Sequence, residues 1–235
     1  MIRKITDVSA ALERLSTDPI GNIYPIALLQ GYPQDDAFYR AFESENGIMV
    51  YAGGTAYLSG RFDKEELDSF LSMLGAQEII VPDDNGNKHI LVYQGKKQIS
   101  TAVSATEGQL SEIWQLLCQN FSNMPNLADF VQAKTAQRLY LGGRTGIVIE
   151  EGRIVSTASI LVQSDTHALL GAVATHPEHR KRGHAGNILH MLIGELLNNE
   201  KTPMILCDNP VAIHLYKGMG FEEYGKMTVK PYVFQ

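Results

Sequence analysis

A run of basic and small residues at positions 173–187 carries the clearest chemistry in the sequence. An apolar stretch ends at Pro177, three cations follow, and small residues then open an amphipathic helix. These cations and small residues are Arg180, Lys181, Arg182, Gly183, Ala185 and Gly186. A helix N-terminus offers backbone N–H groups without intrahelical partners and about half a unit of positive charge. Because small side chains let an anion approach those amides and the cations add charge-assisted donors, the segment predicts a polyphosphate site.

The elements that must position this segment alternate between strand and helix patterns over residues 104–235. Apolar residues three and four positions apart predict helices, and β-rich runs bounded by turn residues predict strands. The predicted helices cover residues 110–117, about 126–137, about 183–198 and 211–218, and the predicted strands cover residues 146–150, 154–162, 166–175 and 204–207. Two closing strands are expected within residues 221–234. The order predicts an α/β fold with a mixed sheet.

The first hundred residues begin with a similar order of elements. Apolar residues at helical spacing predict a first helix, and Asp18 followed by Pro19 predicts the start of a second, short one. Asp63 and Gly75 predict the start and stop of a third helix. Strands are predicted at residues 47–51, 55–59, 78–81 and 88–93. A polar segment after the last of these places a boundary between residues 1–103 and 104–235, and we interpret the first part as a diverged copy of the second.

Composition and charge exclude several classes of protein. The 235 residues are 44% hydrophobic and 20% charged, which excludes collagen-like, disordered and coiled-coil chains. A net charge of −6 argues against general binding to nucleic acid, which needs a cationic surface. The two cysteines, Cys118 and Cys207, are too few for a disulfide framework. With no apolar run of membrane-spanning length and no signal-peptide pattern at the N-terminus, we expect a cytoplasmic protein with no membrane partner.

Two motifs together resemble a known family. The spacing Arg180-x-x-Gly183-x-Ala185, directly after a predicted strand, resembles the signature of the GNAT superfamily of N-acetyltransferases. A second match to that family follows at Asn209-x-x-Ala212-x-x-Leu215-Tyr216-x-x-x-Gly220-Phe221. The resemblance covers residues 104–235, with Phe62 standing where the first half would need a small residue. Several members of the family, including those with a C-terminal module called FR47-like, pair a degenerate first half with an active second half. This chain resembles that arrangement.

The resemblance implies acetyl-CoA as the donor and assigns roles to particular residues. Backbone groups of the strand that carries Val173, Ala174 and Thr175 would bind the pantetheine arm. The pyrophosphate would lie against Arg180, Lys181, Arg182, Gly183, His184, Ala185, Gly186 and Asn187. Asn209 and Ala212 would lie beside the pantetheine and the sulfur end of CoA. Tyr216 matches the tyrosine that protonates the departing thiolate, a role that suits a phenol because it keeps its proton at neutral pH.

The general base is where the sequence departs from the family. Many members place a glutamate on the central strand, but residues 166–175 contain no carboxylate. The remaining candidates are His167, Glu150, Glu151 and Asp208, acting through water. Cys118 is expected to be a buried structural thiol, and Cys207 lies at a strand end where it could line the thioester site. No metal is expected at His176, His179, His184 and His190, because no cysteine or carboxylate set accompanies them in the sequence.

The main interpretation is an N-acetyltransferase that transfers an acetyl group to a primary amine by direct attack on the thioester. The acceptor would be a small-molecule amine or a peptide amine, with the first half completing its cleft. Two alternatives stay open. One is a non-catalytic sensor that binds acyl-CoA, favoured by the missing carboxylate. The other is an interaction protein in which the first half mediates a homodimer.

Overall fold

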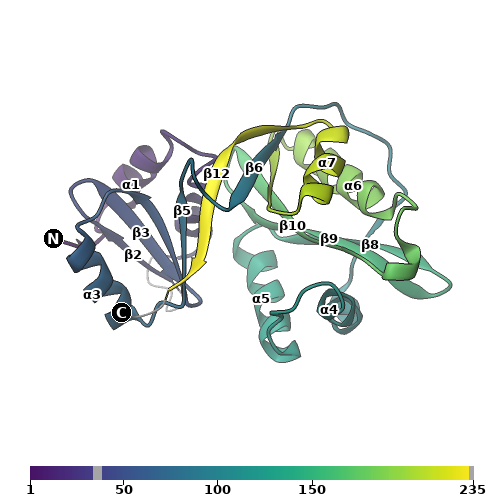
Figure 1. Ribbon diagram of the computed structural model, residues 1–235, viewed down its shortest axis with the longest axis horizontal. Coiled ribbons are helices and arrows are strands. Elements are labelled where there is room, and N and C mark those ends of the chain that lie inside the picture. The colour runs from purple at the N-terminus through teal and green to yellow at the C-terminus, as the bar shows by residue number, and fades with distance from the viewer. Residues whose placement is uncertain (34–38, 233–235) are drawn as a thin grey trace.

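Twelve strands form one continuous sheet in the computed structural model, which describes residues 1–33 and 39–232 (Figure 1). The strands are β1 (Arg3–Lys4), β2 (Tyr39–Glu43), β3 (Gly47–Ala52), β4 (Thr55–Gly60), β5 (Glu78–Pro82), β6 (Lys88–Tyr93), β7 (Val103–Ser104), β8 (Arg144–Glu150), β9 (Arg153–Gln163), β10 (His167–Thr175), β11 (Thr202–Cys207) and β12 (Phe221–Pro231). Their order across the sheet is β1-β2-β3-β4-β5-β12-β6-β11-β10-β9-β8-β7. The predicted mixed α/β fold is confirmed.

Seven α-helices accompany the sheet within the described residues. They are α1 (Val8–Leu15), α2 (Ile23–Gly31), α3 (Lys64–Leu74), α4 (Leu110–Cys118), α5 (Leu127–Tyr140), α6 (His184–Asn198) and α7 (Pro210–Gly218). In Figure 1, α4 and α5 lie on one side of β8–β10, and α6 and α7 lie on the other. None of the helices in these described ranges has both the length and the apolar composition needed to cross a membrane.

Local signals in the first half correctly predicted two helices, α1 and α3, and misplaced another. Asp63 accepts a hydrogen bond from the Glu66 amide at the start of α3, and Gly75 ends this helix in the left-handed conformation with φ 69°. The helix predicted to start at Asp18 and Pro19 is wrong. Asp18 instead accepts a bond from the Gly21 amide within a turn, and α2 begins only at Ile23. The sequence prediction also missed the strands β1, β2 and β7.

The middle of the sheet is built from strands far apart in the sequence. Strands β5 and β6 follow one another along the chain but do not pair, because β12 lies between them. Strand β6 in turn lies between β12 and β11, antiparallel to both. Figure 1 shows β12 in yellow running between the two halves of the molecule. The sheet therefore continues from one half to the other, and the boundary after residue 103 stays a prediction.

A single long strand replaces the two closing strands that were predicted. Residues Phe221–Pro231 form β12, which pairs with β6 along its first part and with β5 along its second. A register shift between Glu223 and Gly225 marks where the strand bends, because one extra residue in a strand increases its local twist. Residues 233 and 234, which the prediction included, lie outside the described residues. One strand thus serves both halves of the sheet.

Candidate active site

Strands β10 and β11 separate at the centre of the second half. They pair in parallel from His167 with Thr202 as far as Leu170 with Ile205. Beyond that point β11 continues along β6, whereas β10 continues along β9. The carboxyl ends of two neighbouring parallel strands therefore diverge, and such a point is where α/β sheets commonly bind ligands.

A β-bulge in β10 begins where the two strands part. Gly171 pairs with Ser159 and Ala174 pairs with Thr157, so Ala172 and Val173 together oppose one residue of β9. Ala172 takes a φ of 51°, in the left-handed region that alanine seldom adopts. A bulge removes residues from the regular ladder and redirects their backbone groups. The backbone of Val173, one of the predicted cofactor-binding residues, accordingly lies outside the regular register with β9.

The loop after β10 leads directly into the N-terminus of α6. Gly183 precedes this helix with φ 81°, and in the described structure no side chain caps it. The first intrahelical bond runs from the Asn187 amide to the Gly183 carbonyl at 2.9 Å, which leaves the amides of the preceding turn without helical partners. A methyl group built on Gly183 would meet no atom within 4 Å. The open helix end has the properties that the sequence predicted for an anion site.

The three cations of the loop have different surroundings. Arg180 donates through Nε to the Thr175 carbonyl at 3.2 Å and through Nη2 to Asn120 Oδ1 at 2.9 Å. Arg182 pairs with Glu150 at 3.3 Å. Lys181 is exposed, takes φ 62°, and forms no hydrogen bond or ion pair with the described residues. Two of the cations therefore hold the loop in place, while the third has its charge free for a ligand.

Glu150 gathers several side chains of this loop. Its Oε2 accepts a hydrogen bond from His179 Nδ1 at 2.7 Å, and its Oε1 lies 3.2 Å from His184 Nε2. The hydrogen bond from His179, helped by the charges of His184 and Arg182, lowers the pKa of Glu150. The expectation that no carboxylate accompanies the histidines is therefore wrong for His179 and His184. One possible ligand atom from each of Glu150, His179 and His184 lies within 4.8 Å of the other two. The fold of the β8–β9 hairpin brings Glu150 to the loop, which spacing alone does not reveal.

The Asn187 side chain points away from the loop and binds a connecting segment. Its Oδ1 accepts hydrogen bonds from Ser100 Oγ at 2.9 Å and from the Thr101 amide at 3.0 Å. Its Nδ2 donates to Thr101 Oγ1 at 2.9 Å. These bonds fix the segment between the two halves against the start of α6. A role for Asn187 in cofactor binding stays a prediction.

The second motif forms the start of α7 and one wall of the core. Asn209 caps the helix, its Oδ1 accepting from the amides of Val211 at 2.9 Å and Ala212 at 3.4 Å. Tyr216 is 5% exposed, and burial raises the pKa of its phenol above the ordinary value. The buried Cys207, at the end of β11, lies near enough to Tyr216 to add to that shift. Tyr216 thus keeps its proton beside the end of the strand that diverges from β10.

The two cysteines do not behave alike. Cys207 is buried, as a residue at the end of a central strand should be, and burial raises the pKa of its thiol. Cys118 is exposed, so the expectation of a buried structural thiol is wrong. It occupies the last position of α4.

The other predicted candidates for the general base lie in three different segments, and two of them have hydrogen-bond partners. Asp208 binds Lys88 Nζ at 2.5 Å, and this hydrogen bond lowers the pKa of the carboxyl. His167 accepts or donates a bond with Thr166 Oγ1 at 2.8 Å and begins β10, five residues before Ala172. Glu151 lies in the β8–β9 turn with φ 51°. Of the predicted carboxylates, Glu150 and Asp208 are therefore engaged in ion pairs, whereas Glu151 forms no ion pair with the described residues.

An apolar pocket on the opposite face of the sheet from α6 reaches the bulge. Its volume is about 470 Å³, and we call it the apolar pocket. Its apolar lining consists of Leu117, Phe121, Met124, Phe130, Ala133, Leu161 and Ala172. Lys134 and Gln137 of α5 also line it. The sequence reasoning missed this site, because the polar positions of α5 resemble those of any helix exposed to solvent.

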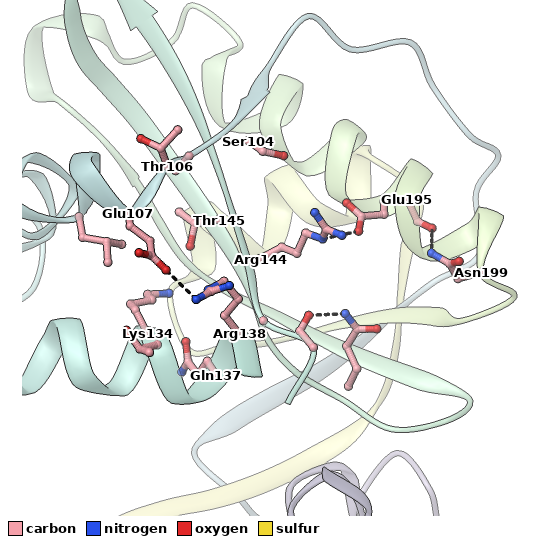
Figure 2. A pocket seen from close by; sticks show the side chains of 16 residues that line it. Ser104, Thr106, Glu107, Lys134, Gln137, Arg138, Arg144, Thr145, Glu195 and Asn199 are labelled. Atoms are coloured by element: carbon pink, nitrogen blue, oxygen red, sulfur yellow. Dashed lines mark hydrogen bonds and ion pairs between the residues drawn. The ribbon is translucent and has the colours of Figure 1, made fainter. Parts of the chain in front are cut away.

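A second pocket meets the first at Lys134 and Gln137. This polar pocket has a volume of about 480 Å³ and is drawn in Figure 2. Figure 2 shows Lys134, Gln137 and Arg138 coming from one helix, with Arg144 and Glu195 on another side. Lys134 Nζ donates to Ser159 Oγ at 2.8 Å, and burial lowers the pKa of the ammonium to about 8. The two pockets thus share one partly buried cation.

Replacing Lys134 with methionine is expected to stabilise the empty protein at pH 7. The lowered pKa means that the folded state binds the lysine proton less well than the unfolded state, whose pKa is near 10.5. Burying the charged lysine lowers the free energy of unfolding. This destabilisation is complete below pH 8 and disappears as the pH rises from about 8 to 10.5. We expect Lys134→Met to raise the free energy of unfolding by on the order of 1 kcal/mol at pH 7 and by less at pH 10. Urea unfolding at both pH values measures this, with Arg138→Met as the control, and a loss of stability at pH 7 would contradict it.

Comparison with known proteins agrees with this geometry. The family model described as GNAT acetyltransferase matches residues 26–229. A GNAT-family protein called a putative acetyltransferase, from Novosphingobium aromaticivorans, is 16% identical with a TM-score of 0.59, covering 92% of this chain and 94% of its own. A GNAT-family acetyltransferase from Colwellia psychrerythraea is 13% identical with a TM-score of 0.59, covering 98% of each chain. No curated protein matches the sequence. Because the family model spans most of the sequence, the chain belongs to the GNAT acetyltransferase family.

Proposed function

We propose that the protein transfers the acetyl group of acetyl-CoA to a primary amine. The observation that carries this proposal is the divergence of β10 from β11 after Leu170 and Ile205, followed directly by the open N-terminus of α6. A long cofactor with a diphosphate at one end and a thioester at the other suits that arrangement. The diphosphate would accept bonds from the amides at residues 183–186 and meet the unpaired charge of Lys181.

The pantetheine arm would extend from the helix end into the space between the diverging strands. Backbone groups of Val173, Ala174 and Thr175 supply hydrogen bonds there, in the way an added strand would receive them. Because Val173 lies in the bulge, its N–H is the donor we assign to the thioester carbonyl. A donor held in place before the reaction stabilises the oxyanion that forms when the amine attacks.

The reaction we propose is a direct displacement. A neutral amine attacks the thioester carbon to form the C–N bond, the oxyanion then collapses and breaks the C–S bond, and Tyr216 gives its proton to the departing sulfur. The attacking nitrogen loses a proton to water, since Glu150 and Asp208 are both engaged in ion pairs. Tyr216 suits the acid role because its raised pKa keeps it protonated through the neutral pH range.

The binding of donor and the chemistry can be tested separately. Acetyl-CoA and CoA are each expected to raise the melting temperature, since a ligand that binds only the folded state stabilises it. A free-thiol assay with acetyl-CoA should then detect CoA release when an amine is supplied. No thermal shift with either ligand would contradict the assigned donor site.

A second candidate function is supported by one observation. Glu150 and Asp208 are both engaged in ion pairs, so neither is free to remove the proton of an amine. A protein that binds acetyl-CoA without transferring its acetyl group would need no such base. This sensor would give the thermal shift and no thiol release with any amine, which distinguishes it from the enzyme.

A further inference from the structure

Lys134 is a cation without an anionic partner. Its Nζ donates to the hydroxyl of Ser159, and among the described residues no carboxylate lies within ion-pair distance of it. The neighbouring Gln137 has an unsatisfied acceptor, because its buried Oε1 receives no hydrogen bond in the described structure. A buried polar group without a partner is unfavourable unless a ligand or water satisfies it. Both side chains line the two pockets at the place where these meet.

The other charged groups around Lys134 are already paired. From α5, Arg138 binds Glu107 at 2.6 Å, and from β8, Arg144 binds Glu195 of α6 at 2.7 Å. Figure 2 shows both pairs on the walls of the polar pocket. From strands β8 and β9, the hydroxyls of Thr145 and Ser159, joined at 2.9 Å, lie beside the lysine, and Ser159 accepts its hydrogen bond. The pocket therefore supplies Lys134 with neutral acceptors and with the ring of Phe130, 5.9 Å from Nζ, but with no anionic partner among the described residues.

Lys134 is linked through its hydrogen-bond partner to strand β10, which carries the bulge. Its partner Ser159 pairs with Gly171, the residue before the bulge in β10. Ala172 of the bulge lines the apolar pocket together with Lys134. A molecule in this pocket therefore lies between an unpaired cation and the strand on which we place the thioester.

On this basis, and resting on the proposed function, we propose that the acceptor is an amine that also carries a carboxylate and an apolar body. The carboxylate would bind Lys134 Nζ, and Gln137 Oε1 would accept a hydrogen bond from an N–H of the amine. The apolar body would contact side chains of the α4–α5 region such as Phe121, Met124 and Phe130. The amine would face the bulge. Apolar amino acids are the simplest compounds with these three features.

Matched acceptors test this assignment. Phenylalanine, leucine and methionine would each be compared with their carboxamides, which keep the amine and the apolar body but lose the negative charge. With acetyl-CoA saturating, we expect KM in the thiol-release assay to be roughly 10- to 100-fold lower for the acid, the range for a hydrogen bond to a charged group. Lys134→Met should remove this preference by raising KM for the acids alone. Lys134→Gln provides a second neutral variant, and thermal melting checks that both are folded.

Arg138→Met is the matched control, because it removes a cation of the same helix that already has a carboxylate partner. This variant should retain the preference for acids. The wild-type KM for the acids should also rise above about pH 8, as Lys134 loses its proton, with a smaller change for the carboxamides.

Three outcomes would overturn the assignment. Equal use of acids and carboxamides would show that no carboxylate is recognised. Thiol release only with amines that lack a carboxylate, or with none of the panel although acetyl-CoA stabilises the protein, would exclude this acceptor class while leaving the donor site intact. A fall in kcat with KM unchanged in Lys134→Met would mean that Lys134 acts on a proton instead. Failure of the proposed function itself would differ from all three, because acetyl-CoA would then give no thermal shift.

Discussion

Glutamate in place of Gly183 is expected to lower the affinity for acetyl-CoA by roughly 100-fold or more. The residue precedes α6, and its amide belongs to the open turn at which we place the diphosphate. A carboxylate there would repel the diphosphate, and like charges brought together cost several kcal/mol in binding. The stabilisation of the protein by acetyl-CoA in a thermal melt should be lost. Isothermal titration gives the affinity directly.

Gly75→Glu is the matched control for backbone strain. Gly75 takes φ 69° at the end of α3, against 81° for Gly183, and a methyl group on either glycine would meet nothing within 4 Å. Both variants should lose a similar stability, about 1–2 kcal/mol, from the left-handed conformation. Only Gly183→Glu should lose cofactor binding. Equal retention of acetyl-CoA affinity in the two variants would contradict the diphosphate site.

Phenylalanine in place of Tyr216 is expected to lower turnover roughly 100-fold while leaving acetyl-CoA affinity within a few fold, as for loss of a general acid. The side chain is nearly buried in the core that α7 forms with the sheet, so the ring of phenylalanine fills the same space. The phenol is lost, and with it the proton that we assign to the departing thiolate. Steady-state thiol release measures turnover, and titration measures affinity.

Tyr93→Phe removes a phenol from the same core. Tyr93 and Tyr216 both contact Phe221, with ring centroids 5.1 Å and 5.9 Å from it. The Tyr93 hydroxyl donates to the Lys96 carbonyl at 2.7 Å, so the control loses a structural hydrogen bond and no proposed proton donor. Its turnover should stay close to that of the wild type. Loss of acetyl-CoA binding in Tyr216→Phe to the same degree as loss of turnover would contradict the acid role.

Elements with local signals could be predicted from the sequence, and elements that depend on distant partners could not. The helix that starts at Asp63 and ends at Gly75 has both signals within its own residues, so its prediction is confirmed. Strand β6 was predicted as a strand, but its place between β11 and β12 depends on residues more than a hundred positions away. The spacing of apolar residues and the turn residues at its ends indicate whether a segment forms a helix or a strand. They carry no information about which other strand it pairs with.

The same distinction applies to the candidate site. The loop at residues 180–187 could be found because its cations and small residues are contiguous, and the helix it opens is confirmed as α6. Glu150 and Lys134 reach their neighbours only through the packing of β8–β9 and of α5 on the sheet. Neither has a sequence neighbour that marks it as different from a solvated charge. Their partners had to be read from the structure.

The place of β12 has a consequence for the order in which the chain can fold during synthesis. This strand joins β5 to β6, pairing Met227 with both Pro82 and Lys88. A ribosome releases residues 78–93 long before residues 221–231. The edges of β5 and β6 that pair with β12 therefore lack this partner until late in translation. Neither half can complete its sheet until nearly all of the described chain has emerged. The two halves can therefore complete their shared sheet only late in synthesis.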